Sequence, residues 1–291
     1  MIIQTTKQSP RNLKKIIYFM LIMTSFTCIT YLFFVLPNLS RQKALVAFQT
    51  TSFAHRGLFD NRCYVPENSL VAFQKAIDYG YGIEMDVQLT KDKVPVVAHD
   101  YNLKRVCGED VLISSLTFEE LSKYTLFNSS EHIPSLEEAL NLIDEQVPIM
   151  IEIKVGFNYR ETCKRVNTYL SDYNGIFSVI AFSPLVLQWF KEHNPDIIRG
   201  QLSTNHMAND FAKAPITKFL LTHLMLNCLS RPDLILYNAQ YEKNFSLNLC
   251  KKLFNSPVAI WTIKNEQDYH RVTTQNNIAI FDNFSPYSFI D

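Results

Sequence analysis

The chain has 291 residues, a length that suits one large α/β domain or two small ones. Its 28 lysines and arginines balance its 28 aspartates and glutamates, so the formal net charge is zero and nothing global steers it toward nucleic acid. It has only 7 glycines, no glycine-rich phosphate loop and no basic patch interleaved with aromatic residues, which argues against nucleotide-binding and nucleic-acid-binding proteins.

The N-terminal part predicts a membrane anchor. Residues 1–15 form a basic segment, and residues 16–37 (IIYFMLIMTSFTCITYLFFVLP) contain no charge. A helix of that length spans about 33 Å at about 1.5 Å per residue, which is enough for a bilayer core. The run is longer than a usual signal-peptide core, and no small-residue cleavage site follows it. It also has no polar face, which disfavours the alternative of a buried helix in a soluble protein. We therefore predict a transmembrane signal anchor over 16–37 and a linker over 38–51.

Two features bear on the sidedness of this single-pass arrangement, and they disagree. Four basic residues precede the apolar run, whereas only Arg41 and Lys43 follow it closely, which favours an extracytoplasmic location for the rest of the chain. After Cys28 come five cysteines, an odd number without a CxxC spacing, so neither a disulfide framework nor a zinc site is indicated. Because free thiols are more at home on a reducing side, the orientation stays open.

From about residue 52 the chain alternates short apolar runs with helical patterns, which is typical of a mainly parallel sheet. Nine runs are predicted as strands: 52–57, 82–88, 94–99, 147–154, 177–183, 196–203, 233–240, 256–263 and 277–284. The run at 94–99 follows the stretch IEMDVQL (83–89) after only TKDK, which is too short for a parallel crossover, so it should fold back as an antiparallel hairpin. Eight strands remain, the number that closes a (β/α)8 TIM barrel over residues 52–291.

Two segments depart from the regular alternation. Residues 100–147 are longer than an ordinary crossover and carry two Ser-x-x-Glu-like helix starts, so we predict a small insertion after the second strand that caps the barrel. The strongly apolar stretch 216–229 (ITKFLLTHLMLNCL) is interpreted as the barrel helix between the fifth and sixth barrel strands. The alternative is a segment that touches the membrane near the anchor.

Polar side chains gather at the carboxyl ends of the predicted barrel strands, which is where barrel enzymes place their active sites. They are His55, Arg56, Glu84, Asp86, Glu152, Lys154, Ser183, Gln201, Asn238, Trp261 and Asp282. Packing alone would favour aliphatic residues at these positions. His99 ends the predicted hairpin beside the strand of Glu84, so it can reach the same mouth.

Glu84, Asp86 and Glu152 predict a metal site. Glu84 and Asp86 lie two residues apart in a strand, so their side chains face the same way. Burying two like charges is costly unless a cation compensates them. An all-oxygen site of this kind suits one divalent cation, Mg²⁺ or Ca²⁺, better than zinc.

The other polar residues indicate which reaction such a metal site could catalyse. His55 and His99 come from different strands and could act as a general acid and base, while Arg56 and Lys154 offer positive charge to a phosphate. Together these groups describe phosphate-ester cleavage better than sugar or acyl chemistry. Each signal alone is weak, since Glu152 and Lys154 could form an ordinary ion pair. Structural roles are expected for the other histidines: His132, His193, His206, His223 and His270.

The motifs that carry these residues resemble those of the glycerophosphodiester phosphodiesterase family, in order from about residue 52 to the C-terminus. The matching stretches are AHRG (54–57), PENSLVAFQKAIDYG (66–80), IEMDVQLTKDKVPVVAHD (83–100), IPSLEEAL (133–140), IEIK (151–154) and WTI (261–263). The resemblance implies a TIM-barrel phosphodiesterase that needs a divalent metal and cleaves a glycerophosphodiester to glycerol 3-phosphate and an alcohol.

The resemblance also implies roles for individual residues. His55 and His99 match the family's catalytic histidines, and Arg56 and Lys154 match residues on the phosphate side, where Trp261 of the WTI motif is also expected to bind substrate. The metal ligands of the family match Glu84, Asp86 and Glu152. Glu67 and Asn68 match a motif beside the active site, although a cap on the following helix is an equally good interpretation.

Two departures from the family pattern affect the substrate rather than the chemistry. The last strand continues as FDNFSP (281–286) in place of Thr-Asp followed closely by Pro, and Ile263-Lys264 replace the usual Asn or Asp after the Trp-Thr pair. The expected partners are a glycerophosphodiester or lysophospholipid substrate and the membrane, with no nucleic acid and no protein partner.

Three alternatives accompany this hypothesis. The first keeps the reaction class but acts on membrane lipid or polymer, as a lysophospholipase D-type or teichoic-acid-type phosphodiesterase. The second is an inactive membrane-bound scaffold, which the presence of all five expected catalytic and ligand positions disfavours. The third is a phospholipase C, which the contiguous IEMD and IEIK motifs disfavour.

Overall fold

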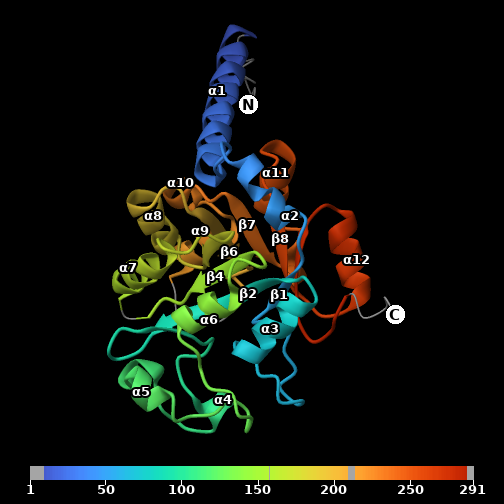
Figure 1. Cartoon of the computed structure of the whole chain (residues 1–291). Helices are drawn as coiled ribbons and strands as arrows, with labels where there is room; N and C mark the ends of the chain where they lie inside the picture. The colour runs from blue at the N-terminus through green and yellow to red at the C-terminus, as the bar shows by residue number, and fades with distance from the viewer. Residues whose placement is uncertain (1–9, 157, 209–213, 287–291) are drawn as a thin grey trace, which may run out of the picture.

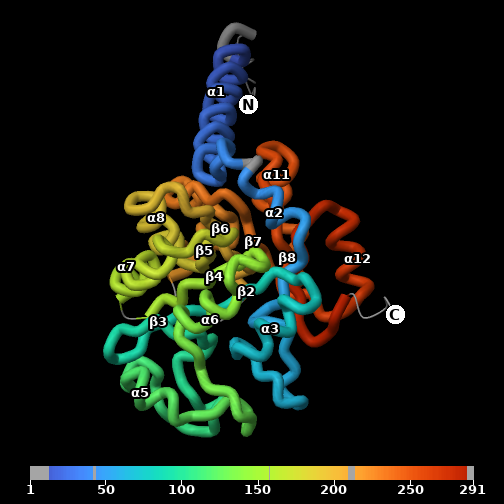
Figure 2. The backbone as a smooth tube through the Cα atoms, in the orientation of Figure 1, coloured from blue at the N-terminus to red at the C-terminus, as the bar shows by residue number. Residues whose placement is uncertain are grey.

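The computed structural model describes residues 10–156, 158–208 and 214–286, and its body is a closed barrel of parallel strands (Figures 1 and 2). β1 pairs with both β2 and β9, which closes the barrel, and β3 (Pro95–Val97) runs antiparallel to β2 as the predicted hairpin. The barrel strands are β1 (Phe53–His55), β2 (Gly82–Leu89), β4 (Ile149–Ile153), β5 (Phe177–Ala181), β6 (Ile198–Ser203), β7 (Leu234–Asn238), β8 (Val258–Ile263) and β9 (Ile278–Phe281).

Helices form a ring around these strands in Figure 1. Several begin where a Ser or Asn side chain accepts a hydrogen bond from a backbone N–H of the first turn, as Ser69 and Ser135 do, which satisfies one of the free donors at a helix start. The ring consists of α3 (Leu70–Asp78), α6 (Leu136–Ile143), α7 (Tyr159–Leu170), α8 (Pro184–His193), α10 (Asn227–Ser230), α11 (Phe245–Leu253) and α12 (Glu266–Thr274). The predicted (β/α)8 TIM barrel is confirmed.

Apolar side chains fill the barrel from its amino-terminal end. Leu45 of η1 (Gln42–Leu45) and Phe48 of α2 (Val46–Gln49) are buried in one cluster with interior residues such as Phe53 and Met150. A second, larger cluster lies between the strands and the surrounding helices. Because apolar residues plug the amino-terminal end, the polar interior positions are left to the carboxyl end, where the strands carry His55, Glu84 and Glu152.

The segment predicted as an insertion forms a small lobe with its own apolar cluster at the lower edge of Figure 1. It contains α4 (Lys104–Cys107), η2 (Ile113–Ser115) and α5 (Phe118–Leu121), and it leads into α6. The two helix-start signals correspond to reciprocal capping boxes, one at the start of α5 and one at the start of α6. The lobe lies after the β2–β3 hairpin, so it borders the carboxyl end of the barrel.

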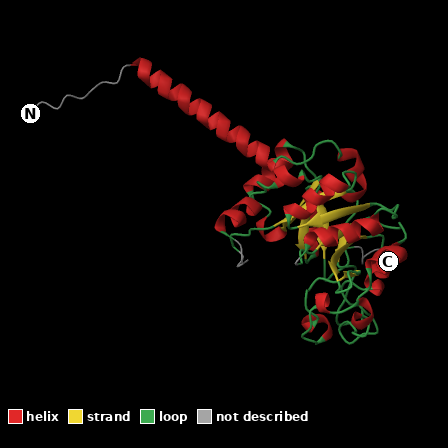
Figure 3. Cartoon of the chain, turned by 90° about the vertical axis from the view of Figure 1, so that its left-hand side faces the viewer, coloured by secondary structure: helices red, strands yellow, loops and turns green. Residues whose placement is uncertain are grey.

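α1 (Pro10–Val35) projects from the body as one long helix (Figure 3). Its stretch Leu13–Val35 has a mean hydropathy of 1.9 and is long and apolar enough to cross a membrane. The end of α1 docks into the body, where Val35 is buried and its carbonyl accepts a hydrogen bond from Asn227. Arg231 donates to the carbonyls of Phe33 and Leu36, so the barrel domain supplies donors to several carbonyls at this helix end.

The apolar stretch 216–229 differs from the single barrel helix that its composition predicts. It divides into α9 (Pro215–Thr222) and α10, which are separated by a turn in which Leu224 has a φ of 54°. Ser203 and Tyr237, near the carboxyl ends of β6 and β7, donate to the carbonyls of the last turn of α9. α10 packs against α8 in the helix ring, whereas α9 is tied to the carboxyl face of the barrel.

Replacing Asp233 by alanine is expected to lower the free energy of unfolding by about 3–5 kcal/mol, because it leaves a buried guanidinium without its partner. Asp233 accepts hydrogen bonds from the backbone N–H of Arg199 at 2.8 Å and from Asn38 at 2.7 Å, and it lies 3.5 Å from the Arg199 guanidinium. Chemical denaturation of the full chain in detergent measures the change. The matched control is Asp196→Ala, which removes an exposed carboxylate beside Arg41 and should leave stability unchanged.

Candidate active site

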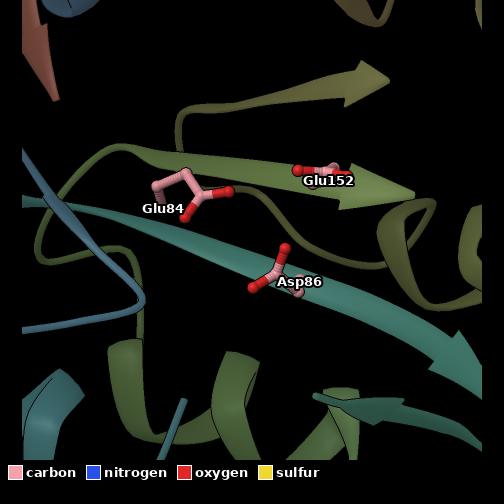
Figure 4. Close-up of side chains that lie close together, drawn as sticks. All are labelled: Glu84, Asp86 and Glu152. Carbon is pink, nitrogen blue, oxygen red and sulfur yellow. The ribbon is translucent and has the colours of Figure 1, made fainter. Parts of the chain in front are cut away.

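Glu84, Asp86 and Glu152 form a compact carboxylate cluster at the carboxyl end of the barrel (Figure 4). Glu84 and Asp86 lie on β2, and Asp86 is the register partner of Glu152 on the neighbouring β4. All three are buried, and one oxygen from each lies within 4.8 Å of the others. The strand periodicity therefore places the predicted metal ligands together, and their donor set of carboxylate oxygens fits a hard divalent cation.

The electrostatics of the cluster reflect burial and mutual repulsion. Burial raises the pKa of Glu84 well above its usual value, and the charges of Asp86 and Glu152 raise it further. Burial also raises the pKa of Glu152. For Asp86 burial acts in the same direction, but the Lys154 and Arg56 charges outweigh it and hold the pKa well below its usual range. The cluster therefore concentrates negative charge that a divalent cation would neutralise.

Two cations lie directly against these carboxylates. The Lys154 Nζ is 2.7 Å from both Asp86 Oδ1 and Glu152 Oε1, and the Arg56 Nε is 3.4 Å from Asp86 Oδ2. Sequence reasoning predicts Arg56 and Lys154 on the phosphate side, and both do line the catalytic cavity, but they also hold the carboxylates in place. Three carboxylates against two cations leave an excess of one formal negative charge when all three are ionised.

His55, at the end of β1, lies between two carboxylates. Its Nδ1 is 3.2 Å from Oδ2 of Asp282, which follows β9, and its Nε2 is 3.9 Å from Oε2 of Glu84. The His55 hydrogen bond holds the pKa of Asp282 below its usual value, although burial opposes this. Asp282 thus orients the imidazole, a role that its position at a strand end does not reveal.

His99 follows β3 and is oriented in the same manner by its neighbour Asp100. Its Nδ1 lies 2.6 Å from Asp100 Oδ1, and Asp100 also accepts a 2.6 Å hydrogen bond from Arg105. Burial lowers the pKa of His99, and the charges of Lys154 and Arg56 lower it further against the opposing charge of Asp86. A neutral imidazole is therefore favoured at neutral pH.

The two histidines face one cavity of about 630 Å³, which we call the catalytic cavity. Its lining includes Trp261, whose ring meets Phe182 edge to face with centroids 5.5 Å apart. The indole Nε1 of Trp261 is buried and has no hydrogen-bond partner among the described residues, so it is free to donate to a ligand. The residues predicted as catalytic, metal-binding or phosphate-binding line this cavity, with one exception: His55, Arg56, Glu84, His99, Glu152, Lys154 and Trp261. The exception is Asp86, which contacts the lining residues Lys154 and Arg56.

The turn after β1 explains why the sequence needs glycine beside the histidine and arginine. Arg56 and Gly57 both have positive φ angles, of 61° and 81°. A Cβ on Gly57 would lie 2.9 Å from the backbone of Ala72, so a larger residue is excluded there. The turn points the backbone N–H of Arg56 at Glu84, which accepts its hydrogen bond at 3.2 Å.

The interpretation of Glu67 and Asn68 as site residues is favoured over that of helix caps, because Ser69 is the residue that caps α3. Asn68 donates to Asp86 at 2.9 Å, and Glu67 accepts a 2.6 Å hydrogen bond from Arg56. Glu67 also accepts hydrogen bonds from both terminal nitrogens of Arg105, at 2.7 and 2.8 Å. Arg105, from α4 of the insertion, therefore joins Glu67 to the Asp100 that orients His99, and sequence reasoning missed it.

Replacing Arg105 by methionine is expected to lower the free energy of unfolding by about 1–2 kcal/mol at pH 7. Burial alone would raise the pKa of Glu67, but hydrogen bonds from Arg105 and the Arg56 charge lower it to about 2 from an ordinary 4.5. A lowered carboxylate pKa stabilises the fold above pH 4.5, and this stabilisation disappears as pH falls toward 2. Denaturation from pH 7 to pH 2.5 should therefore show the wild-type advantage shrinking below pH 4.5. An advantage that is constant with pH would contradict the assignment.

The remaining polar strand-end residues and histidines play other parts. Gln201 is buried, and its amide donates to backbone carbonyls within the barrel, while Asn238 caps the short η3 (Ala239–Tyr241). Ser183 lies at the start of α8, outside the catalytic cavity. Within the described part of the chain the cavity lining contains none of the histidines expected to be structural: His132, His193, His206, His223 and His270.

Comparison with known proteins places this site in a family. The model of the glycerophosphoryl diester phosphodiesterase family matches residues 55–285. Human lysophospholipase D GDPD1 is 31% identical over 288 residues, which cover 86% of this chain and 87% of that protein. A glycerophosphodiester phosphodiesterase of Bacillus altitudinis is 40% identical over 113 residues, but the chain spans only 45% of that relative's length.

Solved structures support the fold. An Oleispira antarctica phosphodiesterase, in complex with the product sn-glycerol-3-phosphate, superposes with a TM-score of 0.64 at 23% identity, over 80% of this chain and 92% of that one. The family model and the human relative both extend over nearly the whole barrel, and the structural match covers 80% of the chain. The chain belongs to the glycerophosphoryl diester phosphodiesterase family.

Proposed function

We propose that the chain hydrolyses glycerophosphodiesters to glycerol 3-phosphate and an alcohol in a metal-dependent reaction. The observation that carries this proposal is the placement of two histidines, each oriented by its own carboxylate, in one cavity with a buried cluster of three further carboxylates. The names of the relatives and the glycerol 3-phosphate bound to the Oleispira antarctica enzyme support the same substrate class.

The residues that would hold the metal are Glu84, Asp86 and Glu152, and the cation would be Mg²⁺ or Ca²⁺. A divalent cation bound there would stabilise the negative charge that develops on the phosphoryl oxygens. Arg56 and Lys154 line the cavity beside the cluster, so they place positive charge near a bound phosphate. The unpartnered Trp261 N–H supplies a further hydrogen-bond donor to the substrate.

The two histidines divide the proton transfers between them. His99, whose pKa is lowered by burial, serves as the general base and takes the proton of the attacking hydroxyl at Nε2, while Asp100 holds its Nδ1. His55 serves as the general acid: Asp282 holds its Nδ1, and its Nε2 gives a proton to the departing alkoxide. The new P–O bond forms to water or to the substrate's own glycerol hydroxyl. Detection of a cyclic phosphate by ³¹P NMR would identify the second route.

The full chain in lipid nanodiscs provides the test, with glycerophosphocholine as substrate and Mg²⁺, Ca²⁺ or EDTA added. Metal-dependent release of glycerol 3-phosphate that is lost in His55→Ala is expected. Inactivity on every glycerophosphodiester with either metal would refute the proposal.

We also propose that α1 anchors the enzyme in a membrane as a single span, with the barrel on the extracytoplasmic side. The charge-free apolar helix and the basic residues that precede it support this arrangement. Cys63 is exposed on the barrel domain, so a membrane-impermeant maleimide should label it in intact cells and should not label Cys63→Ser beyond background. Labelling only after the cells are broken would reverse the orientation.

Lysophospholipids are the second candidate substrate class. The name of the human relative, which covers most of this chain, supports it, as does a large apolar groove that opens beside the catalytic cavity.

A further inference from the structure

A second hollow, which we call the apolar groove, adjoins the catalytic cavity and has a volume of about 1140 Å³. Its volume exceeds the range of about 300–1,000 Å³ that is usual for small-molecule sites. Tyr101 and Arg105 of the insertion stand on the polar side of the groove; its first apolar wall is the start of α8 with Pro184 and Leu185, and its second is the α9–α10 segment. That second wall contributes Thr217, Leu221, Leu226 and Leu229.

The groove and the catalytic cavity are continuous. His99, Glu152, Lys154 and Phe182 line both, so the groove ends at His99 and Lys154. Its chemistry therefore changes along its length, from charged groups at the cavity end to aliphatic side chains beyond Phe182. A ligand that fits both ends has a phosphate at one end and an apolar tail at the other.

The anchor helix leaves the body on the face where the cavity opens. Tyr31 of α1 hydrogen-bonds Ser246 in the first turn of α11 at 2.8 Å, and the carbonyl of Val35 meets Cys250 further along α11, so the two helices run in parallel there. α11 starts at the carboxyl end of the barrel because it follows β7. Upstream of Tyr31, α1 therefore extends beyond the carboxyl face of the barrel. Downstream of the helix, the backbone N–H of Asn38 donates to the carbonyl of Pro232, which lies before β7 at the amino-terminal end of the barrel.

Exposed apolar side chains border the groove on this same face. Ile216 and Phe219 on α9 are 64% and 44% exposed, and Leu185 at the start of α8 is 46% exposed. Ser203 and Tyr237 attach α9 to the carboxyl ends of their strands, so these side chains stand on the same side of the body as α1. Exposed apolar residues of this kind mark a surface that meets lipid when a membrane anchor holds it there.

We propose that the apolar groove binds the acyl chain of a lysophospholipid drawn from the bilayer that α1 spans, with its phosphodiester in the catalytic cavity. The inference rests on the proposed function, which supplies the reaction. Water adds to phosphorus, its proton passes to His99, the P–O bond to the head-group alcohol breaks, and His55 protonates the departing alkoxide. The products are the free alcohol and an acylglycerol phosphate whose chain stays in the groove until release.

The test compares the full chain with two tryptophan variants in nanodiscs. Thr217→Trp places a large ring inside the groove, whereas the control Leu253→Trp places the same ring on the exposed last turn of α11, at the opposite end of the barrel. Substrates are glycerophosphocholine, which has no chain, and lysophosphatidylcholines of 6 to 16 chain carbons below their micelle concentrations. Wild-type kcat/KM is expected to rise with chain length, by at most about fourfold for each buried methylene.

Thr217→Trp is expected to lower kcat/KM at least tenfold on the long-chain substrates and to change it less than twofold on glycerophosphocholine. Leu253→Trp should match the wild type on both. A chain-length dependence that Thr217→Trp leaves unchanged would overturn the groove as the chain site. If Thr217→Trp loses both activities equally, the same comparison is made with Leu226→Trp, at the other end of the wall. A loss of kcat/KM on the long-chain substrates alone then supports the groove, and an equal loss on both substrates overturns it.

Different experimental results would contradict the acyl-chain groove and the proposed function. A wild-type enzyme that turns over glycerophosphocholine with no gain from an acyl chain overturns the groove alone. A wild-type enzyme that is inactive on every diester, with either metal, overturns the reaction itself.

Discussion

Alanine in place of His55 or His99 is expected to lower kcat by about 10²- to 10⁴-fold, which is the usual loss when a general acid or base is removed. Both side chains line the catalytic cavity and neither belongs to the apolar core, so the free energy of unfolding should change little. Steady-state kinetics on glycerophosphocholine measures the loss. The matched control is His193→Ala, which removes a histidine that bonds the Trp189 carbonyl on the far end of α8 and should leave kcat unchanged.

The two variants should then separate when the leaving group is altered. A p-nitrophenyl phosphodiester expels a stabilised phenolate that needs no proton, so the loss of a general acid matters little for it. If His55 is the acid, His55→Ala recovers most of the wild-type rate on this substrate and His99→Ala stays impaired. Recovery by His99→Ala instead would exchange the two roles, and recovery by neither would assign both histidines to binding or metal positioning.

The architecture was predictable because its signals are local. Each barrel strand is a short apolar run bounded by polar residues, and the five-residue connection after β2 leaves no choice but a hairpin for β3. The clustering of Glu84, Asp86 and Glu152 follows in the same way, from a period of two within one strand and from the parallel neighbour of that strand. The grouping of polar side chains at strand ends is therefore predictable from sequence.

Features that depend on contacts between distant segments were not predictable. Arg105 reaches Glu67 and Asp100 only because α4 of the insertion packs beside them, and no spacing in the sequence encodes that approach. The division of 216–229 into α9 and α10 is also set by tertiary partners, since Ser203 and Tyr237 bind the carbonyls where α9 ends. Composition marks this stretch as apolar, but it does not determine which part covers the barrel and which part borders a groove.

Glu152→Gln is expected to abolish metal-dependent turnover, with a loss of at least about 100-fold, while the metal-free protein keeps its stability or gains up to about 2 kcal/mol. The physical reason is that burial and the neighbouring carboxylates outweigh the favourable charge of Lys154, so the Glu152 charge opposes folding when no divalent cation is bound. A glutamine of the same shape keeps an oxygen for the hydrogen bond from Lys154 and removes the charge. Any metal-induced rise in thermal stability should disappear in Glu152→Gln, because the charge that binds the metal is gone.

Lys154→Met provides the opposite change at the same cluster. It removes the cation that lies 2.7 Å from both Asp86 and Glu152, so the metal-free protein should lose about 3–5 kcal/mol. Because the uncompensated carboxylates then attract a divalent cation more strongly, Mg²⁺ or Ca²⁺ should restore part of the loss. Denaturation of both variants in EDTA and in either metal measures this contrast. If Glu152→Gln were less stable than the wild type in EDTA and still gained stability from metal, the three carboxylates would be a structural network rather than the metal site.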